Sequence, residues 1–171
     1  MRKKVLILAA VACFLFVIAP HAGAQMKIGY IDTPKILATW EPALAAQKKL
    51  EGEANAVQME LQKREADIRD SQAKIEQQGL MLTEQKKAQK QQEIQDMIVQ
   101  YQTFMQEKQV EIGKRREELF QPVTDKINDA IKKIGDDAGY DYILDTAQGV
   151  LLYVQDGHDL TEKIMEELNK K

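Results

Sequence analysis

The sequence predicts an α+β protein that is mostly α, in which a long antiparallel helical hairpin projects as an arm from a small β body. Between Ala43 and Ile134 the chain is dominated by Gln, Lys, Glu and Ala, and its apolar residues recur at steps of three, four and seven, as in long helices. Short runs rich in β-branched and aromatic residues lie on either side, at residues 26–32 and 139–155, and these favour strands.

The first 24 residues are typical of a secretory signal peptide. Positive residues 2–4 precede the apolar stretch 5–19, and Ala22-Gly23-Ala24 supplies the small residues of a cleavage site. The apolar stretch is shorter than the roughly 20 residues of a membrane-spanning helix, and a lipid-modified Cys13 would have to end it rather than lie inside it. We therefore expect residues 1–24 to be removed on export, which leaves a chain without cysteine.

The charge of the chain is unevenly distributed. Loss of the three positive residues at positions 2–4 would change the formal net charge from −3 to −6. Residues 48–116 contain 13 Lys or Arg and 12 Asp or Glu, whereas residues 117–171 contain 6 and 13. An acidic protein of this kind is poorly suited to general binding of nucleic acid or of anionic membranes.

The first structured element after the signal peptide is predicted to be a strand. In MKIGYID (residues 26–32), Ile28 and Tyr30 alternate with Lys27 and Gly29, as in a half-buried strand. Asp32-Thr33-Pro34 follows and combines a capping residue with a proline in the first turn, which predicts the start of a short helix.

The first helix of the arm is predicted from Ala43 to about Gly79. One line of residues spaced by seven is apolar throughout, and comprises Ala54, Leu61, Ile68, Ile75 and Leu82. The companion line begins with Leu50 and Val57 but becomes polar at Arg64 and Ser71. The coiled-coil seam is therefore complete near the base of the arm and only half apolar further out.

A chain reversal is predicted at residues 79–83, where Gly79 can end one helix and Thr83 can cap the next. The second helix then runs from Glu84 to a stop at Gly139. Two long helices joined by so short a turn form an antiparallel hairpin. We assign residues 43–116 to this arm, and residues 25–42 and 117–171 to a β-rich oligomerisation body.

A β-hairpin is predicted near the C-terminus, with strands at residues 140–144 and 150–154 around a turn at residues 146–149. A last helix is expected at residues 160–169. The run Val150–Val154 has no polar side, so both of its faces need to be covered. Three short strands are few for an independent sheet, and we expect several chains to combine them in a shared core. The expected oligomer core residues are Ile28, Tyr30, Tyr142, Leu144, Leu151 and Tyr153. The alternative is that the last helix covers the strands within a monomer.

No catalytic, cofactor or metal site is predicted. After export the chain has His158 as its single histidine and no cysteine, so the usual nucleophile and base pairs cannot be assembled. No glycine-rich phosphate loop follows a strand, and the acidic loops lack the spacing of a calcium site. We therefore expect neither an enzyme nor a cofactor.

The arm carries apolar residues that the seam does not fully account for. Methionine side chains are pliable and suit surfaces that accept many partners, although they also fill irregular seams. The candidate client-facing residues are Met59, Leu80, Met81, Leu82, Met97, Phe104, Met105 and Val110.

The chain resembles the Skp/OmpH family of periplasmic chaperones. The resemblance is carried by KIGYID near the start, by GYDYILDTAQGVLLY, by DLTEKIMEELNK at the end, and by the long helical hairpin between them. It implies a jellyfish-like homotrimer in which strands of three chains form a shared β-barrel and three arms enclose a cavity. It further implies a periplasmic holdase that binds unfolded outer-membrane β-barrel proteins without ATP.

One property departs from the resemblance, because the best-known members of the family are strongly basic. Here the arms are nearly neutral, so we assign no lipid-binding or lipopolysaccharide-binding residues and expect clients to be held mainly by apolar contacts. The alternative function is a structural coiled-coil spacer or envelope tether. A nucleic-acid-binding protein is disfavoured by the acidic balance.

Overall fold

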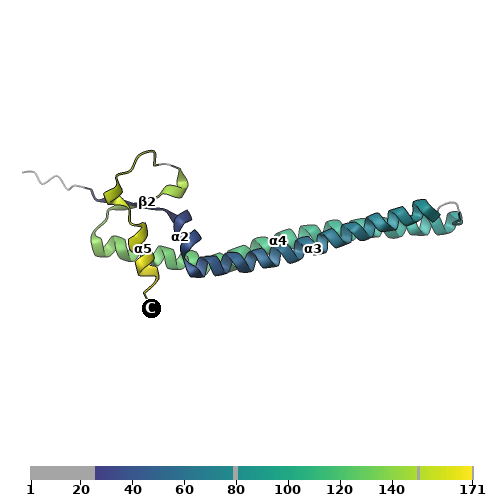
Figure 1. The fold of residues 1–171 in the computed structure, drawn as a ribbon, viewed down its shortest axis with the longest axis horizontal. Helices are drawn as coiled ribbons and strands as arrows, with labels where there is room; N and C mark the ends of the chain where they lie inside the picture. Colours follow the sequence, from purple (N-terminus) through teal and green to yellow (C-terminus); the bar gives the residue numbers. More distant parts are fainter. Residues whose placement is uncertain (1–25, 79–80, 150, 171) are drawn as a thin grey trace, which may run out of the picture.

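A computed structural model describes residues 26–78, 81–149 and 151–170 of the chain. The predicted signal peptide lies outside the described residues. A small body at one end of the molecule carries a long helical hairpin, which projects from it as an arm (Figure 1).

The N-terminal segment forms the predicted strand and short helix. Strand β1 (Ile28–Ile31) leads into helix α2 (Thr33–Thr39), and the Asp32 carboxylate caps this helix by accepting from the Lys35 amide at 3.0 Å. Proline in the first turn needs no amide partner, so Pro34 suits the helix start. The chain turns at Trp40 into the long helix α3 (Glu41–Gln78).

Helix α3 and helix α4 (Glu84–Ala138) form the antiparallel hairpin that the sequence predicts. Thr83 caps α4 by accepting from the Lys86 amide at 3.4 Å, and α4 ends at Gly139, whose φ of 65° is the left-handed conformation that glycine favours. By the usual rise of 1.5 Å per residue, α3 is about 57 Å long. The arm is therefore much longer than the body is wide (Figure 1).

Contacts across the hairpin define its register. Glu53 pairs with Arg115, Arg64 lies over Phe104, and Ser71 contacts Met97. All three pairs fit the same antiparallel register. The two helices therefore run side by side with no insertion in either one between Glu53 and Ser71.

The sheet differs from the prediction. Strand β2 (Tyr142–Asp145) pairs in parallel with β1, with Ile28 opposite Tyr142 and Ile31 opposite Asp145. The chain then forms the 3₁₀ turn η1 (Thr146–Gln148) and a left-handed Gly149. The predicted β-hairpin is wrong, because the described residues 151–154 of its second strand pair with neither β1 nor β2.

The physical reason is that a strand needs the backbone of a neighbour. On β1, Tyr30 forms an isolated bridge with Asp159, and the Leu160 amide donates to the Tyr30 carbonyl at 2.8 Å. The apolar run is instead exposed to solvent, with Leu152 97% and Tyr153 87% accessible. Its composition indicated a buried strand, but the part of the chain that the structure describes supplies no strand partner for residues 151–154.

The core of the body lies where α2, the first turns of α3, the end of α4 and the last helix α5 (Thr161–Leu168) meet. Trp40 is only 3% exposed, and Ile36 and Ile164 are fully buried. Its buried residues are Ile31, Ile36, Trp40, Ala43, Ala46, Val123, Ile127, Ala130, Leu160 and Ile164. The first two turns of α3 therefore belong to this core, and the rest of the hairpin projects beyond it.

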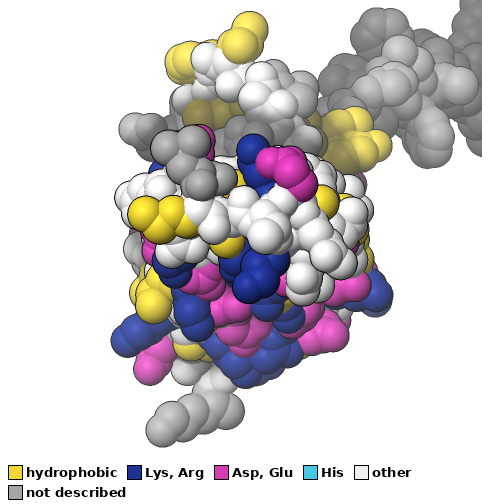
Figure 2. All heavy atoms as spheres, turned by 90° about the vertical axis from the view of Figure 1, so that its right-hand side faces the viewer, with side chains coloured by type: hydrophobic (Ala, Val, Ile, Leu, Met, Phe, Trp, Pro, Cys, Tyr) yellow, Lys and Arg dark blue, Asp and Glu magenta, His cyan; other side chains and the backbone are white. Residues whose placement is uncertain are grey.

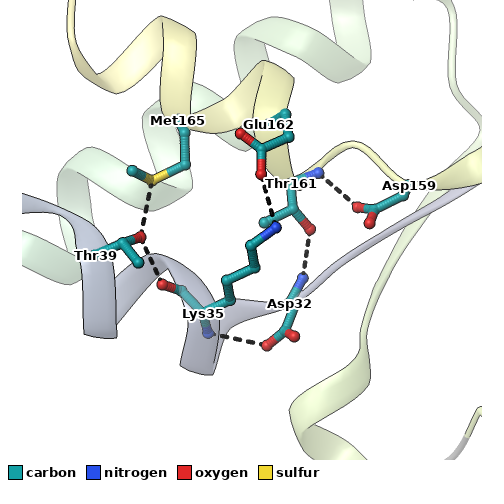
Figure 3. A network of polar contacts seen from close by, with 7 residues as sticks. All are labelled: Asp32, Lys35, Thr39, Asp159, Thr161, Glu162 and Met165. Atoms are coloured by element: carbon teal, nitrogen blue, oxygen red, sulfur yellow. Dashed lines mark hydrogen bonds and ion pairs between the residues drawn. The ribbon is translucent and has the colours of Figure 1, made fainter.

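Polar contacts fasten the C-terminal helix to the N-terminal segment (Figure 3). The buried Thr161 hydroxyl accepts from the Asp32 amide at 3.0 Å, and the Thr161 amide donates to Asp159 at 2.8 Å. Lys35 and Glu162 form an exposed ion pair at 2.7 Å. Both ends of the described chain are thus held in the body, and the arm is the long connection between them.

Candidate functional site

The two-stranded sheet has a covered face and an open face. A Cβ at Gly29 would lie 2.5 Å from Leu160 Cδ1, so the start of α5 closes over this side of the sheet. Ile31 is also buried there, at 2% exposure. Helix α5 covers this face only, whereas on the other face Ile28 is 39% and Leu144 40% exposed.

The open face brings together residues that are far apart in the sequence. The parallel register sets Ile28 opposite Tyr142 and Tyr30 opposite Leu144, and alternate residues of a strand point to the same side. Tyr142 is 55% exposed. Four of the six predicted oligomer core residues therefore form one apolar surface.

A groove of about 320 Å³ borders this surface. It is lined by Ile28, Gly29, Tyr30, Leu144, Leu151, Tyr153, Val154, Gln155 and His158. Five of the six predicted oligomer core residues line the groove, and Tyr142 lies beside it on the sheet. Six of these nine residues have apolar or aromatic side chains, so the groove is a mainly apolar surface.

The sequence did not indicate that Val154, Gln155 and His158 would line this groove. His158 follows an Asp-Gly turn, and its Nδ1 lies 2.7 Å from the Ile28 carbonyl oxygen of β1. This contact holds the chain against β1 again, after the exposed residues Leu152 and Tyr153. The Asp-Gly pair was the available signal for a turn, but a turn does not reveal the strand to which it returns.

The candidate client-facing residues are spread along the arm, and the structure does not gather them in one pocket. Met59, Met81, Met105 and Val110 have exposed fractions of 69%, 91%, 41% and 58%. Leu80 lies outside the described residues. These four exposed candidates are therefore separate apolar side chains, distributed along the arm from its tip toward the body.

The remaining three candidates are half-buried in the seam of the hairpin. Met97 Sδ lies 3.9 Å from the Ser71 hydroxyl, at a position where the companion line of α3 is polar. The Arg64 guanidinium lies 4.1 Å from the Phe104 ring centroid and the Lys108 ammonium 5.7 Å. Leu82 is half-buried at the reversal. Met97 and Phe104 therefore contact residues of the other helix of the arm.

Charges of both signs interleave on the arm. Seen from the tip, Lys and Arg side chains alternate with Asp and Glu, and hydrophobic side chains lie between them (Figure 2). Hydrogen bonds to Glu53 and Glu118 raise the pKa of Arg115 above its ordinary value. Because opposite charges are adjacent, the arm provides no large surface of one sign for electrostatic capture of a partner.

Within residues 26–78, 81–149 and 151–170, no group of three or more His, Cys, Asp or Glu side chains could hold a metal ion. In the same part of the chain, no helix is both long and apolar enough to cross a membrane.

Comparison with known proteins assigns the fold and the family. The family described as outer membrane protein (OmpH-like) matches residues 27–168. The chaperone protein Skp of Vibrio cholerae is 28% identical over 148 residues, which cover 86% of each chain. The chaperone protein Skp of Pectobacterium atrosepticum is 23% identical over 154 residues, with 89% of this chain and 92% of the relative covered.

A solved structure agrees with the architecture. It is that of a Caulobacter crescentus protein described as an outer membrane chaperone (OmpH-like), and it superposes with a TM-score of 0.71 over 88% of both chains at 14% identity. At this identity the likeness establishes the fold. Because the family match spans nearly all of the described residues, the chain belongs to the Skp/OmpH family.

Proposed function

We propose that this protein is an ATP-independent holdase that binds unfolded outer-membrane β-barrel proteins in the periplasm and prevents their aggregation. The proposal rests on one observation above all. An open apolar sheet face and groove lie in the body, and from this body extends a long arm with exposed apolar side chains. The first surface suits self-association and the second suits weak, adaptable contacts with an unfolded client.

The proposed assembly is a homotrimer formed through the open sheet face. A two-stranded sheet is marginal on its own, and residues 151–154 expose apolar side chains beside it without a strand partner among the described residues. Neighbouring copies would supply those partners and cover Ile28, Tyr142 and Leu144. The three arms would then enclose a space in which a client is held.

The test is an aggregation assay. A β-barrel outer-membrane protein, unfolded in urea, is diluted into buffer without nucleotide, and light scattering is followed with and without the purified chain. We expect suppression of aggregation near one assembled oligomer per client. A matched control is a variant in which α3 and α4 are shortened by equal numbers of residues, so that the register of the hairpin is kept; it should assemble but protect poorly.

The same assay separates the alternative function. A coiled-coil spacer or envelope tether would assemble but would leave client aggregation unchanged at every ratio. That result would refute the holdase proposal. Export is tested separately, by cell fractionation and by N-terminal sequencing of the purified chain, which should begin at Gln25.

A further inference from the structure

One row of residues along α4 carries no charge over about six turns. Ala88, Gln91, Gln95, Val99, Gln102, Gln106 and Gln109 follow one another at steps of three and four, so they lie along one side of the helix. Every one of them is exposed. We call the five glutamines together with Val99, which is 58% exposed, the amide face.

The amide face borders a groove between the two helices of the arm. Near the tip, Gln91 and Gln95 line a cavity of about 780 Å³ together with Gln72 of α3. Ile75 and Ile94 are also among its lining residues. The groove thus offers side-chain amides beside apolar side chains, with Glu76 as the one charged residue in its lining.

The other side of the arm is charged. A second groove is lined by Glu60, Lys63, Arg64 and Asp67 of α3, with Gln100 of α4 beside them. On α4 the exposed acids at positions 93, 96, 107, 111 and 118 fall outside the row that forms the amide face. The arm therefore has two chemically different sides, although its total charge is nearly balanced.

The amides of the five glutamines are available for a partner. No Asp or Glu stands three or four residues before or after any of them, so they lack the carboxylate neighbours that a helix would provide. Within the described residues, none of the five side-chain amides forms a hydrogen bond. By contrast, Gln89 donates to Glu93 at 3.3 Å and Gln121 donates to Asp125 at 2.8 Å.

We propose that the amide face binds the backbone of an extended, unfolded polypeptide. A carboxamide carries the same donor and acceptor groups as a peptide bond, so it can pair with any backbone whatever the side chains. Unfolded clients of different sequence share only this chemistry. The inference rests on the proposed holdase function and specifies how that holdase recognises its clients.

The spacing of the glutamines fits such a partner. A step of four residues along α4, as from Gln91 to Gln95 or from Gln102 to Gln106, is about 6 Å, close to the roughly 6.7 Å between every second residue of an extended chain. From Gln91 to Gln109 the face is about 27 Å long, which matches about eight extended residues. Several weak hydrogen bonds could therefore form along one client segment.

The experiment compares two triple variants that remove the same number of amides. Q95A/Q102A/Q106A changes the amide face, and Q89A/Q100A/Q121A changes the other side of α4. Alanine is at least as good a helix former as glutamine, so neither variant should unfold the arm, which circular dichroism verifies. We expect affinity for the unfolded outer-membrane protein to fall about tenfold (about 1.4 kcal/mol) in the first variant and less than about twofold in the second.

A third variant, Q95E/Q102E/Q106E, keeps the size of the side chains but removes their amide donors, and it is compared with wild type at about 0.5 M salt so that the added charges are screened. The proposal expects it to bind more weakly than wild type. Wild-type affinity in the glutamate variant, or equal losses in the two alanine variants, would overturn backbone recognition. If the wild-type chain fails to bind the client at all, the proposed holdase function itself fails, and that outcome is seen before any variant is compared.

A spectroscopic measurement tests the same contact directly. With ¹⁵N-labelled glutamine in the assembled protein, we expect client addition to shift the side-chain amide signals of Gln95, Gln102 and Gln106. The signals of Gln89 and Gln121, whose amides are held by carboxylates, should change little. Uniform shifts across all of them, or shifts confined to the second group, would contradict the proposal.

Discussion

Arg115 on α4 and Glu53 on α3 form an ion pair across the hairpin, in which Arg115 Nε donates to both carboxylate oxygens at 2.9 and 3.1 Å. The same guanidinium donates to Glu118 at 2.7 Å. The network lies just beyond Leu50, the last buried residue of α3, and before the companion line of the seam becomes polar at Arg64. A charged contact thus supports the hairpin where hydrophobic packing declines.

We predict that Arg115→Ala loosens the hairpin without unfolding the body. Side chains in this pair are about one third exposed, so the contribution is modest, and amide exchange in the arm should accelerate by less than about tenfold. Hydrogen exchange with mass spectrometry measures this. Arg69→Ala is the matched control, since among the described residues Arg69 pairs only with Glu65 of its own helix. An equal acceleration there would contradict the role of the cross-hairpin pair.

Hydrogen exchange should also differ between the arm and the body. We expect fast exchange from residue 64 to residue 90, where the seam is half apolar, and slow exchange from Tyr142 to Tyr153. In the single chain Tyr153 is 87% exposed, so protection of this segment would have to come from assembly. It should therefore decrease on dilution, whereas uniform protection of arm and body would refute the prediction.

The double substitution Leu151→Asp and Tyr153→Asp should produce monomers. Both residues line the groove beside the sheet, and a carboxylate buried in an apolar interface is strongly unfavourable. Mass in solution by light scattering gives the result. Leu152→Asp is the control, because Leu152 is 97% exposed and does not line the groove. An unchanged mass of the double variant would remove the argument for this interface.

The contact between α5 and α4 should weaken in acid. Hydrogen bonds from Lys133 and Lys170 lower the pKa of Glu167 below its ordinary value. The stabilisation is therefore complete above the ordinary glutamate pKa of about 4.3 and is lost as the pH falls through the lower value of the folded state. Thermal unfolding from pH 6 to pH 3 should show a smaller loss in Glu167→Gln than in wild type. Glu166→Gln, which changes an exposed side chain on the same helix, should behave like wild type.

Client affinity should depend little on salt. The arm interleaves charges of both signs, and residues 48–116 contain 13 basic and 12 acidic residues. Raising the salt concentration from about 0.05 M to about 0.5 M should change the dissociation constant by less than about threefold, since apolar contacts and neutral hydrogen bonds are not screened. A steep fall in affinity would show that electrostatic capture dominates.

The helical part of the fold was predicted closely because its signals are local. Asp32 and Thr83 cap the helices that follow them, and Gly139 ends α4. Each of these signals acts within about one turn of helix, so the amino acids on either side are enough to recognise it. The family could also be inferred from the sequence, since its characteristic segments begin at residue 27 and continue near the C-terminal end.

The strands were predicted less well. Strand β1 and strand β2 were expected, but the second strand of the hairpin was not found, because β2 pairs with the distant β1 rather than with its neighbour in the chain. Similarly, Phe104 was expected among the apolar residues that the seam does not fully account for, but it is half-buried beneath Arg64. Neither outcome follows from the periodicity of the sequence. Periodicity shows which residues share one side of a helix or strand, but it does not show which other element packs against that side.

The sequence by itself determined where the helices lie, where they end, and where the seam of the arm becomes polar. These features depend on residues within a few positions of one another in the chain. The open face of the sheet does not. It exists because residues more than 100 positions apart, such as Ile28 and Tyr142, pair in parallel while Leu160 closes over Gly29 on the opposite side. Which apolar residues remain exposed depends on this long-range packing, since burial is a property of neighbours in space.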